Sequence, residues 1–372
     1  MHIGIDARLT FYRTGGISTY IRRLVQALEA LDTTNQYTVF HSRKASDSLV
    51  TRFRRAALWT PSHHRLERLT LTVELLPHRL DLLHSPDFIP PLGGARHHVI
   101  TVHDLNFLHY PQFLTDESRR YYNGNIGAAV RDADHILADS AATKADMVQI
   151  LGVPAEKITV HMLGVDESFK PLLADEVARV AAELDLPETY FLFVGTFEPR
   201  KNIAGLLDAY RLLSERQPNA PPLVLVGNRG WLLDETIARI EQLGLNQRVL
   251  WREKVSQAHL PALYNRALAL VTPSFYEGFG LPALEAMACG TVPIVSDRGS
   301  LPEVVGDVGL QVDPDDPASI AGAMEQALTD DAWRDVMEHA GLHRAAAFTW
   351  EATARTTLSV YQSLAHEVRG EK

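Results

Sequence analysis

The sequence predicts an α/β protein made of two doubly wound parallel sheets. Short apolar runs alternate with longer helical patterns along the chain, as in parallel strands joined by right-handed helical crossovers. Several runs are continuously apolar, which is typical of strands covered on both faces. The alternation starts afresh near Tyr190, and a length of 372 residues fits two domains better than one.

The apolar runs predict the strands, and the periodic stretches between them predict the helices. The predicted strands are His2–Ile5, Tyr37–Phe40, His98–Val102, His135–Ala138, Tyr190–Val194, Pro222–Val226, Val249–Trp251, Leu268–Thr272 and Val292–Val295. The predicted helices are Thr19–Leu31, Ile203–Glu215, Asp234–Leu243, Pro282–Ala288 and Trp350–Glu367. Open α/β sheets bind ligands beyond the carboxyl ends of their strands, so the residues that follow each strand are the candidates for a site.

A stretch with little predicted structure, residues 164–187, separates the two patterns. We expect an N-terminal Rossmann-like domain over residues 1–168 and a C-terminal Rossmann-like domain over 169–349, with a helix over 350–372 that packs back on the first. Residues 1–168 hold 18 basic and 18 acidic side chains, whereas the rest hold 18 basic and 28 acidic. This unequal charge indicates two domains with different partners.

Composition excludes several classes of protein. A hydrophobic content of 46% and a charged content of 22% exclude a disordered chain. The net charge of −10 disfavours general nucleic-acid binding. The single cysteine, Cys289, excludes an internal disulfide and a cysteine-rich metal site. No signal peptide is evident, and no apolar run approaches the roughly 18–20 residues that span a bilayer, so we expect a cytoplasmic protein.

A glycine pair, Gly15 and Gly16, follows the first predicted strand and precedes a helix. Glycines allow close approach of the backbone, and a helix N-terminus attracts anions, so this loop is a candidate phosphate contact. An ordinary turn in which Ser18 or Thr19 caps the helix is the alternative.

Two adjacent cations, Arg200 and Lys201, follow the strand predicted at Tyr190–Val194. At a turn from strand to helix they can form a pyrophosphate clamp, in which the arginine acts as a fork and the lysine as a point charge. A solvated turn is the alternative.

The most informative segment runs from Thr272 to Glu285. Its glycines free the backbone, and Pro282 suits the first turn of a helix. Glu277 and Glu285 flank this helix start, where carboxylates can accept hydrogen bonds from sugar hydroxyls; a pair of capping acids is the alternative.

The same segment also matches G-x-G-x-x-A from Gly278 to Ala283, and Asp297 follows at a roughly suitable distance. This match supports a rival interpretation as a nicotinamide-dependent oxidoreductase.

The block EGFGLPALEAMACGTVPIVS, with its Glu-x7-Glu spacing, resembles the signature of family 4 retaining glycosyltransferases. The segments GGISTYIRRL, TVHDLNFLHYP, VGTFEPRKN and LVGNRGW resemble other parts of that family in the expected order, so the resemblance covers nearly the whole chain. It implies the GT-B fold, in which two Rossmann-like domains face a cleft. Residues 1–168 are then expected to bind the acceptor and residues 169–349 the nucleotide sugar.

The resemblance also implies roles for individual residues. Glu285 is expected to bind the nucleotide ribose, and Glu277 the hydroxyls of the donor sugar. Arg200 and Lys201 are expected to neutralise the diphosphate, although many members carry an arginine where this chain has Thr196.

Backbone and histidine contacts complete this implied site. The N–H groups of Phe279, Gly280 and Leu281 are expected near the phosphates or the sugar. His103 is expected to reach the donor sugar from the N-terminal domain, with Asp104 orienting it or binding acceptor.

The implied reaction moves a sugar from a nucleotide diphosphate sugar, a substrate rather than a cofactor, to an acceptor hydroxyl with retention of configuration. No second carboxylate stands out as a nucleophile, so we expect a same-face mechanism. GT-B enzymes generally need no metal, and we expect none here; the D-x-D of residues 313–315 lies in a predicted loop.

The donor and acceptor follow from the resemblance less directly. The segments look most like bacterial mannosyltransferases that use GDP-mannose in surface polysaccharide or lipopolysaccharide assembly. Transfer of rhamnose or glucose and epimerisation of a nucleotide sugar are the alternatives.

Residues 51–80 hold six arginines and two glutamates among apolar side chains. This stretch predicts peripheral contact with the anionic inner face of a membrane or with a lipid-linked glycan acceptor, and a solvated face is the alternative.

Overall fold

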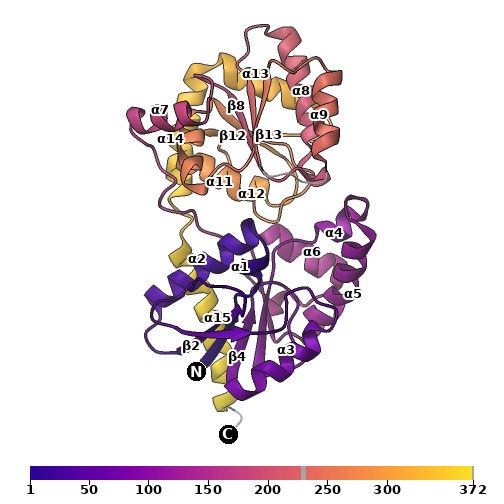
Figure 1. Ribbon diagram of the computed structural model, residues 1–372, viewed down its shortest axis with the longest axis vertical. Coiled ribbons are helices and arrows are strands. Elements are labelled where there is room, and N and C mark those ends of the chain that lie inside the picture. The colour runs from indigo at the N-terminus through magenta and orange to yellow at the C-terminus, as the bar shows by residue number, and fades with distance from the viewer. Residues whose placement is uncertain (228–231, 371–372) are drawn as a thin grey trace. The chain divides into compact units, whose positions relative to one another are not determined.

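The computed structural model describes residues 1–227 and 232–370, and it divides the chain into two compact units. The N-terminal unit comprises Met1–Gly164 together with Thr349–Lys372, and the C-terminal unit comprises Val165–Phe348. Each unit is a parallel sheet with helices packed on it (Figure 1).

The sheet of the N-terminal unit has seven strands within the described residues, in the order β3-β2-β1-β4-β5-β6-β7. The strands are β1 (His2–Asp6), β2 (Gln36–Ser42), β3 (Arg54–Leu58), β4 (Leu80–Ser85), β5 (Ala95–Val102), β6 (His135–Ala138) and β7 (Ile158–Val160). The helices are α1 (Leu9–Tyr12), α2 (Gly16–Leu31), α3 (Glu67–Leu75), α4 (Asn106–His109), α5 (Asp116–Asp132), α6 (Ala141–Leu151) and α15 (Trp350–Gly370). Because β1 pairs with β2 on one side and β4 on the other, the order reverses between β1 and β4.

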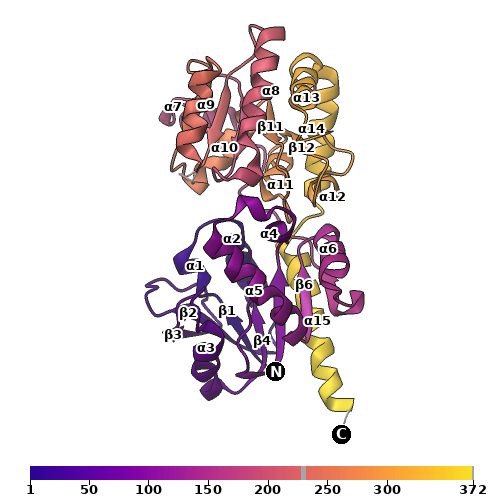
Figure 2. The ribbon, with the colours of Figure 1, turned by 90° about the vertical axis from the view of Figure 1, so that its right-hand side faces the viewer.

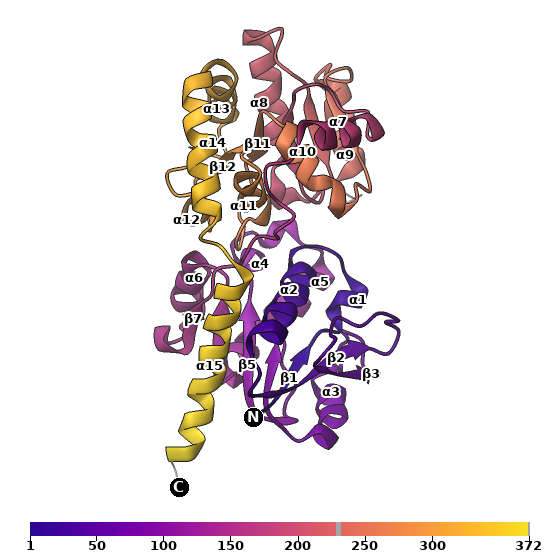
Figure 3. The ribbon, with the colours of Figure 1, turned by 90° about the vertical axis from the view of Figure 1, so that its left-hand side faces the viewer.

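The last helix, α15, belongs to the N-terminal unit and lies alongside α2 (Figure 3). Tyr361 on α15 makes a 2.6 Å hydrogen bond to Nδ1 of His84, and Thr357 lies 3.0 Å from Nδ1 of His161. These buried contacts join the end of the chain to strand β4 and to the residue that follows β7.

The sheet of the C-terminal unit has six strands within the described residues, in the order β10-β9-β8-β11-β12-β13. The strands are β8 (Phe191–Val194), β9 (Leu223–Val226), β10 (Val249–Arg252), β11 (Ala269–Thr272), β12 (Val292–Ser296) and β13 (Leu310–Val312). The helices are α7 (Ala174–Glu183), α8 (Ile203–Arg216), α9 (Leu233–Gln242), α10 (Leu260–Arg266), α11 (Leu281–Ala288), α12 (Leu301–Val305), α13 (Pro317–Thr329) and α14 (Asp331–Ala345). Here α13 packs beside α8 (Figure 2), and the strand order reverses between β8 and β11.

Continuously apolar strands form the centre of the C-terminal core. Phe191, Phe193, Leu223 and Leu225 are fully buried and pack with the inward faces of α8 and α13. Burial on both faces explains why these strands show no polar alternation.

The structure corrects the predicted elements in two places. The stretch 164–187, expected to be weakly structured, contains helix α7, whose apolar side buries Val180 and Ala181. Strands β3, β4, β7 and β13 were not predicted, and residues 51–80 are an edge strand and a separate helix rather than one amphipathic segment. In the part of the chain that the structure describes, no helix is long and apolar enough to cross a membrane.

Candidate active site

Two loops meet at the point where the strand order of the C-terminal unit reverses. One follows β8 and carries Arg200 and Lys201 in a short 3-10 helix; the other follows β11 and carries Glu277. The N–H of Phe275 donates to the carbonyl of Arg200 at 2.8 Å, which ties the loops together. This is the position at which open α/β sheets bind ligands.

The Glu277 carboxylate lies between the two cations. Lys201 Nζ donates to Oε1 at 2.5 Å and Arg200 Nη1 donates to Oε2 at 2.8 Å. The Ser274 hydroxyl adds a 2.8 Å hydrogen bond to Oε1. Arg200 Nε also donates to Glu198 at 3.1 Å. The structure therefore brings together three of the predicted site residues, and we call Arg200, Lys201 and Glu277 the cation cluster.

Burial and neighbouring charges both shift the pKa values of this cluster. Burial raises the pKa of the Glu277 carboxyl, but Lys201 and Arg200 outweigh it and lower that pKa to about 2. Burial and the neighbouring Arg200 charge lower the pKa of Lys201. Glu277 is thus a fixed anion whose two oxygens hold both cations in place.

Asn202, which sequence analysis did not single out, fixes the position of the loops. Its backbone is left-handed with φ 54°, and its side chain caps helix α8 by accepting from the N–H of Gly205 at 3.2 Å. Its amide donates to the carbonyls of Pro273 at 3.1 Å and Pro314 at 2.7 Å. One residue therefore joins the loops after β8, β11 and β13. Its signal in the sequence was an asparagine directly before a helical pattern.

Gly280 is the N-cap residue of helix α11 and has a backbone conformation that favours glycine. Its φ is 96°, and a Cβ placed there would lie 2.5 Å from Cδ2 of Leu301. Pro282 occupies the first turn of the helix, as predicted. Phe279 is buried, and Leu281 is the first helical residue. These residues bring a helix N-terminus to the carboxyl edge of β11.

Glu285 lies one turn further along α11 and is separate from the cation cluster in its contacts. Its Oε2 accepts a 2.8 Å hydrogen bond from the Tyr264 hydroxyl. Burial raises the pKa of Glu285 to about 7, against a smaller lowering by the Tyr264 hydrogen bond. A carboxyl that is poorly solvated and bound to one hydroxyl gains from further hydroxyl donors.

His103 lies in the N-terminal unit, at the end of β5. Its Nδ1 is 2.7 Å from Oδ2 of Asp139, and its Nε2 is 2.8 Å from the carbonyl of Pro86. Burial lowers its pKa, but Asp139 and Asp87 outweigh burial and raise it to about 9. A protonated ring donates to both partners, so both ring nitrogens are engaged within this unit.

The partner that orients His103 is Asp139, not Asp104. Asp104 instead accepts from the backbone N–H of Asn106 at 3.0 Å and from its side-chain amide at 2.6 Å. Asp139 directly follows β6, the strand beside β5, so a search of the strand ends would have found it.

In the glycine loop of the N-terminal unit, neither Ser18 nor Thr19 caps the helix that follows. Gly15 is the N-cap residue of α2 with φ 125°, and the helix begins at Gly16. Ser18 and Thr19 therefore lie inside the helix, and Ser18 donates to the carbonyl of Arg13 instead of capping. A glycine at this cap leaves the first N–H groups of α2 without a side-chain cap.

Two further sequence motifs, the D-x-D and LVGNRGW, lie in loops or partly outside the described residues. The D-x-D of residues 313–315 is a loop in which Arg298 pairs with Asp313 at 3.0 Å and Asp315 at 2.5 Å. The segment LVGNRGW ends in residues 228–231, which lie outside the described residues.

Two doubly wound parallel-sheet units form the architecture of GT-B glycosyltransferases. The fold is similar to that of sucrose-phosphate synthase (tll1590) from Thermosynechococcus elongatus, with a TM-score of 0.79. That comparison covers 98% of this chain and 99% of the other, at 24% sequence identity.

Sequence comparisons identify the family. The profile described as Glycosyltransferase Family 4 matches residues 14–169, and the one described as Glycosyl transferases group 1 matches residues 175–344. The chain is 33% identical over 372 residues to O-antigen chain mannosyltransferase B of Escherichia coli, covering 95% of this chain and 97% of that protein. It is 32% identical over 272 residues to the serotype-specific mannosyltransferase WbdA of Escherichia coli, covering 72% of this chain and 33% of that protein. The chain belongs to glycosyltransferase family 4, and this membership removes the oxidoreductase alternative.

Proposed function

We propose that this glycosyltransferase moves a mannosyl residue from GDP-mannose to a hydroxyl of a glycan or lipid-linked acceptor in cell-surface polysaccharide synthesis. The names of its two Escherichia coli relatives support the sugar, and the first of them matches nearly the whole chain. The observation that carries the proposal is the cation cluster at the carboxyl edge of β8 and β11, where Lys201 and Arg200 hold one carboxylate.

The donor binds mainly to the C-terminal unit in this proposal. Arg200 and Lys201 contact the diphosphate, and the N–H groups of Phe279, Gly280 and Leu281 lie against the phosphates or the sugar. Helix α11 begins here and adds the positive end of its dipole.

Carboxylates hold the uncharged parts of the donor. Glu285 accepts hydrogen bonds from the ribose and Glu277 from the hydroxyls of the donor sugar. From the N-terminal unit, Gly15 and Gly16 approach the phosphates and His103 approaches the donor sugar. Because both ring nitrogens of His103 are engaged, its contribution is a positive charge and the position of Pro86.

Charge on the leaving diphosphate is the main chemical problem. Two cations fixed by Glu277 are preorganised, so they stabilise the developing charge without rearranging. The reaction proceeds on one face with retention, and the departing phosphate assists deprotonation of the acceptor hydroxyl. The chain's own cations fill the role that a divalent ion fills elsewhere, and we propose that no metal is required.

A donor panel tests this proposal. Thermal shift and product formation are measured with GDP-mannose, UDP-glucose, TDP-rhamnose and ADP-glucose, and proton NMR assigns the anomeric configuration of the product. We expect the largest shift and transfer with GDP-mannose and an α-linked product. Preference for another nucleotide sugar contradicts the assignment of GDP-mannose as the donor. A product with inverted configuration contradicts the retaining mechanism. An isomerised nucleotide sugar without transfer indicates an epimerase.

We further propose peripheral contact with the anionic inner face of a membrane through residues 51–80. Helix α3 and its flanks expose apolar side chains at helical spacing: Leu66, Leu69, Val73 and Leu76, of which Leu69 is 56% and Val73 67% exposed. Arg65 and Arg79 are exposed near the two ends of this apolar row. Exposed apolar side chains beside arginines suit an anionic lipid surface.

Two other arginines of this stretch are held by contacts within the unit. Arg68 pairs with Asp132 at 2.7 Å, and Arg52 donates to the carbonyl of Asp32 at 2.7 Å. Phe53 and Leu58, expected in the amphipathic stretch, are buried. The contact surface is therefore the outer row of α3 rather than the whole of 51–80.

Vesicle sedimentation tests the membrane proposal separately from the donor proposal. Wild type and Leu69→Asp are spun with vesicles of phosphatidylcholine alone and with added phosphatidylglycerol. We expect sedimentation only with the anionic lipid, and loss of it in the variant. Equal behaviour of the two proteins, or no sedimentation with either lipid, contradicts the proposal.

A further inference from the structure

Helix α15 is joined to His103 by a series of buried hydrogen bonds within the N-terminal unit. Nδ1 of His103 lies 2.7 Å from Oδ2 of Asp139, and the other oxygen of that carboxylate lies 3.3 Å from Nε2 of His161. Nδ1 of His161 lies 3.0 Å from the hydroxyl of Thr357 on α15. We call Asp139, His161 and Thr357 the His103 support.

The sheet explains how residues so far apart in sequence come together. His103 follows β5, Asp139 follows β6 and His161 follows β7. These three strands are neighbours in the sheet, so the residues that follow them lie side by side at its carboxyl edge. The support therefore runs along this edge from His103 to α15.

All three residues of the His103 support are buried. A buried polar side chain lowers stability unless it is hydrogen-bonded. Apolar side chains of similar volume join a helix to a sheet without that cost, and replacing buried ionic groups by them is often neutral or stabilising. Packing alone therefore does not account for the polar residues between α15 and His103.

The charge of Asp139 sets the direction of its hydrogen bonds. Although burial opposes ionisation, His103 and His161 hold the pKa of the Asp139 carboxyl below its ordinary value. An ionised carboxylate only accepts, so His103 donates to it from Nδ1 and His161 from Nε2. Each oxygen of Asp139 thus has one ring donor, and Nδ1 of His161 is left to the Thr357 hydroxyl.

A second series of contacts joins α15 to the same histidine. Tyr361, one turn further along the helix, bonds to Nδ1 of His84. Nε2 of His84 lies 2.8 Å from the Thr101 hydroxyl, which lies 2.8 Å from the hydroxyl of Tyr20. The Tyr20 ring meets the His103 ring edge to face, with 5.0 Å between their centroids. Helix α15 thus acts on the His103 ring both through its Nδ1 partner and through its packing.

We propose that His161 and Thr357 are positioning residues for sugar transfer, because they hold Asp139, and through it the His103 ring, in one orientation. This rests on the proposed function, in which His103 approaches the donor sugar. A misplacement of about 1 Å can lower a rate roughly 10²-fold, so the orientation of this ring matters to the reaction as well as to the fold. The last helix, which carries none of the predicted site residues, then acts on the reaction through the core of its unit.

The first readout of the test needs no donor. The full chain is prepared with isotopically labelled histidine, and the ring signals of His103 are assigned by their loss in His103→Gln. The signal followed by NMR is that of the proton between His103 Nδ1 and Asp139. This proton is visible only while its hydrogen bond protects it from exchange with water. The second readout is the initial rate of transfer from GDP-mannose.

The variants change one hydrogen bond each. Thr357→Val removes the hydroxyl that faces His161 and keeps the shape of the side chain. Its matched control is Thr353→Val, one turn earlier on α15, because the buried hydroxyl of Thr353 donates to the carbonyl of Met162 at 2.6 Å and not to the His103 support. His161→Phe removes the donor to Asp139, and His161→Gln restores an N–H donor. Thermal melting checks that each variant folds, and the two threonine variants decide the matter should His161→Phe unfold.

We expect a sharp His103 signal in wild type and in Thr353→Val. The signal should broaden in Thr357→Val and in His161→Phe and recover in part in His161→Gln. The transfer rate should fall about 2–10-fold in Thr357→Val, the effect of one buried hydrogen bond. It should fall up to about 10²-fold in His161→Phe, with partial recovery in His161→Gln.

Two results overturn the proposal. One is a His103 signal in Thr357→Val that matches those of Thr353→Val and wild type, and the other is an equal loss of rate in the two threonine variants. Either would mean that the Thr357 hydrogen bond serves the fold alone. Absence of transfer from GDP-mannose by wild type would instead overturn the donor proposal. The rates are then measured with whichever sugar nucleotide the donor panel identifies, and the NMR result stands independently of it.

Discussion

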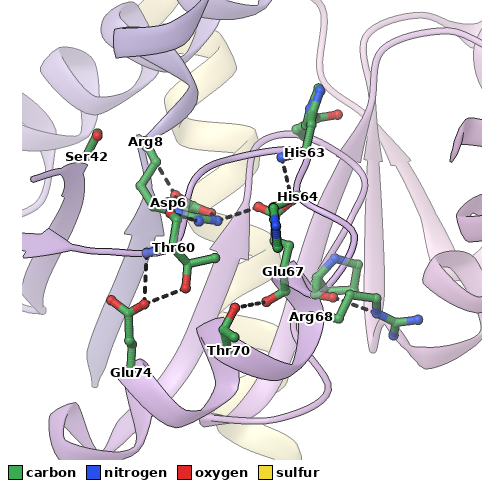
Figure 4. A network of polar contacts seen from close by, with 12 residues as sticks. Asp6, Arg8, Ser42, Thr60, His63, His64, Glu67, Arg68, Thr70 and Glu74 are labelled. Carbon is green, nitrogen blue, oxygen red and sulfur yellow. Dashed lines mark hydrogen bonds and ion pairs between the residues drawn. The ribbon is translucent and has the colours of Figure 1, made fainter. Parts of the chain in front are cut away.

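Each unit has an ion cluster at the point where its strand order reverses, and the signs of the charges in the two clusters are exchanged. Where strand order reverses in the C-terminal unit, one carboxylate, Glu277, lies between two cations. Where it reverses in the N-terminal unit, one guanidinium, Arg8, lies between the carboxylates of Asp6 and Glu67 (Figure 4). The same sheet topology thus holds one carboxylate between two cations in one unit and one cation between two carboxylates in the other.

This difference shows that net charge is a poor guide to the local charge at the strand ends. The C-terminal part of the sequence is acidic overall, yet it carries the adjacent cations. The N-terminal part is balanced, yet two carboxylates surround the guanidinium of Arg8 there. The charge near the strand ends of each unit therefore does not follow the total charge of its part of the sequence.

The largest expected effect comes from breaking the N-terminal cluster. Arg8→Met leaves the buried carboxylates of Asp6 and Glu67 without their partner, so we expect a loss of about 3–5 kcal/mol in the free energy of unfolding. Urea denaturation followed by circular dichroism measures it. Arg96→Met is the control, because Arg96 is exposed and lies 3.7 Å from Asp81. Equal unfolding midpoints for the two variants would show that the cluster is dispensable.

Removing one cation of the C-terminal cluster should act on activity instead. Lys201→Met leaves Glu277 bonded to Arg200 and Ser274, so the fold is retained. We expect kcat/KM with GDP-mannose to fall about 10²–10³-fold, the usual cost of one preorganised donor. Initial rates measure this. Arg211→Met, in an exposed pair with Glu215, should leave the rate unchanged, and a rate loss shared by both variants would count against a specific role.

The buried carboxyl of Glu285 predicts a smaller, pH-dependent effect. Its folded pKa of about 7 lies above the ordinary 4.5, so ionisation destabilises the fold increasingly as pH rises from 4.5 to 7 and fully above 7. Glu285→Gln should therefore gain about 1–3 kcal/mol over wild type at pH 8 and little at pH 4.5. Unfolding titrations at both values check it, with Glu215→Gln as an exposed control. A gain that does not change with pH would contradict the buried-carboxyl account.

The smallest expected effect is that of removing divalent ions. If Arg200 and Lys201 supply the charge that the diphosphate needs, dialysis against EDTA should leave the transfer rate unchanged. The rate is compared before dialysis, after it, and after magnesium or manganese is restored. A rate that collapses and recovers with one of these ions would contradict the account.

Sequence patterns predicted the C-terminal unit better than the N-terminal one. Strands β8 and β11 are continuously apolar, so the loops that follow them could be located and their charged residues selected. Arg200, Lys201 and Glu277 lie together as those loops suggested, and the fold class and the family are confirmed. Asn202 was missed because the carbonyls to which its amide donates, those of Pro273 and Pro314, lie on two loops that are distant in sequence.

The part of the N-terminal unit where β1 meets β4 could not be predicted because β4 itself does not show a strand pattern. Asp81 and His84 interrupt its apolar residues. Their partners are distant in sequence: Asp81 accepts from the N–H of His2 at 2.8 Å, and His84 bonds to Thr101 and Tyr361. Polar residues that are satisfied only by tertiary contacts hide a buried strand from a search for apolar runs.

The most direct test of the contrast between the two units is the affinity for GDP-mannose, measured by isothermal titration calorimetry on wild type, Lys201→Met and Ser85→Ala. The account predicts that Lys201→Met weakens binding about tenfold or more, because it removes a charged contact to the diphosphate, and that Ser85→Ala, at the end of β4 in the N-terminal unit, binds like wild type. Unchanged affinity in Lys201→Met, or a loss confined to Ser85→Ala, would contradict it.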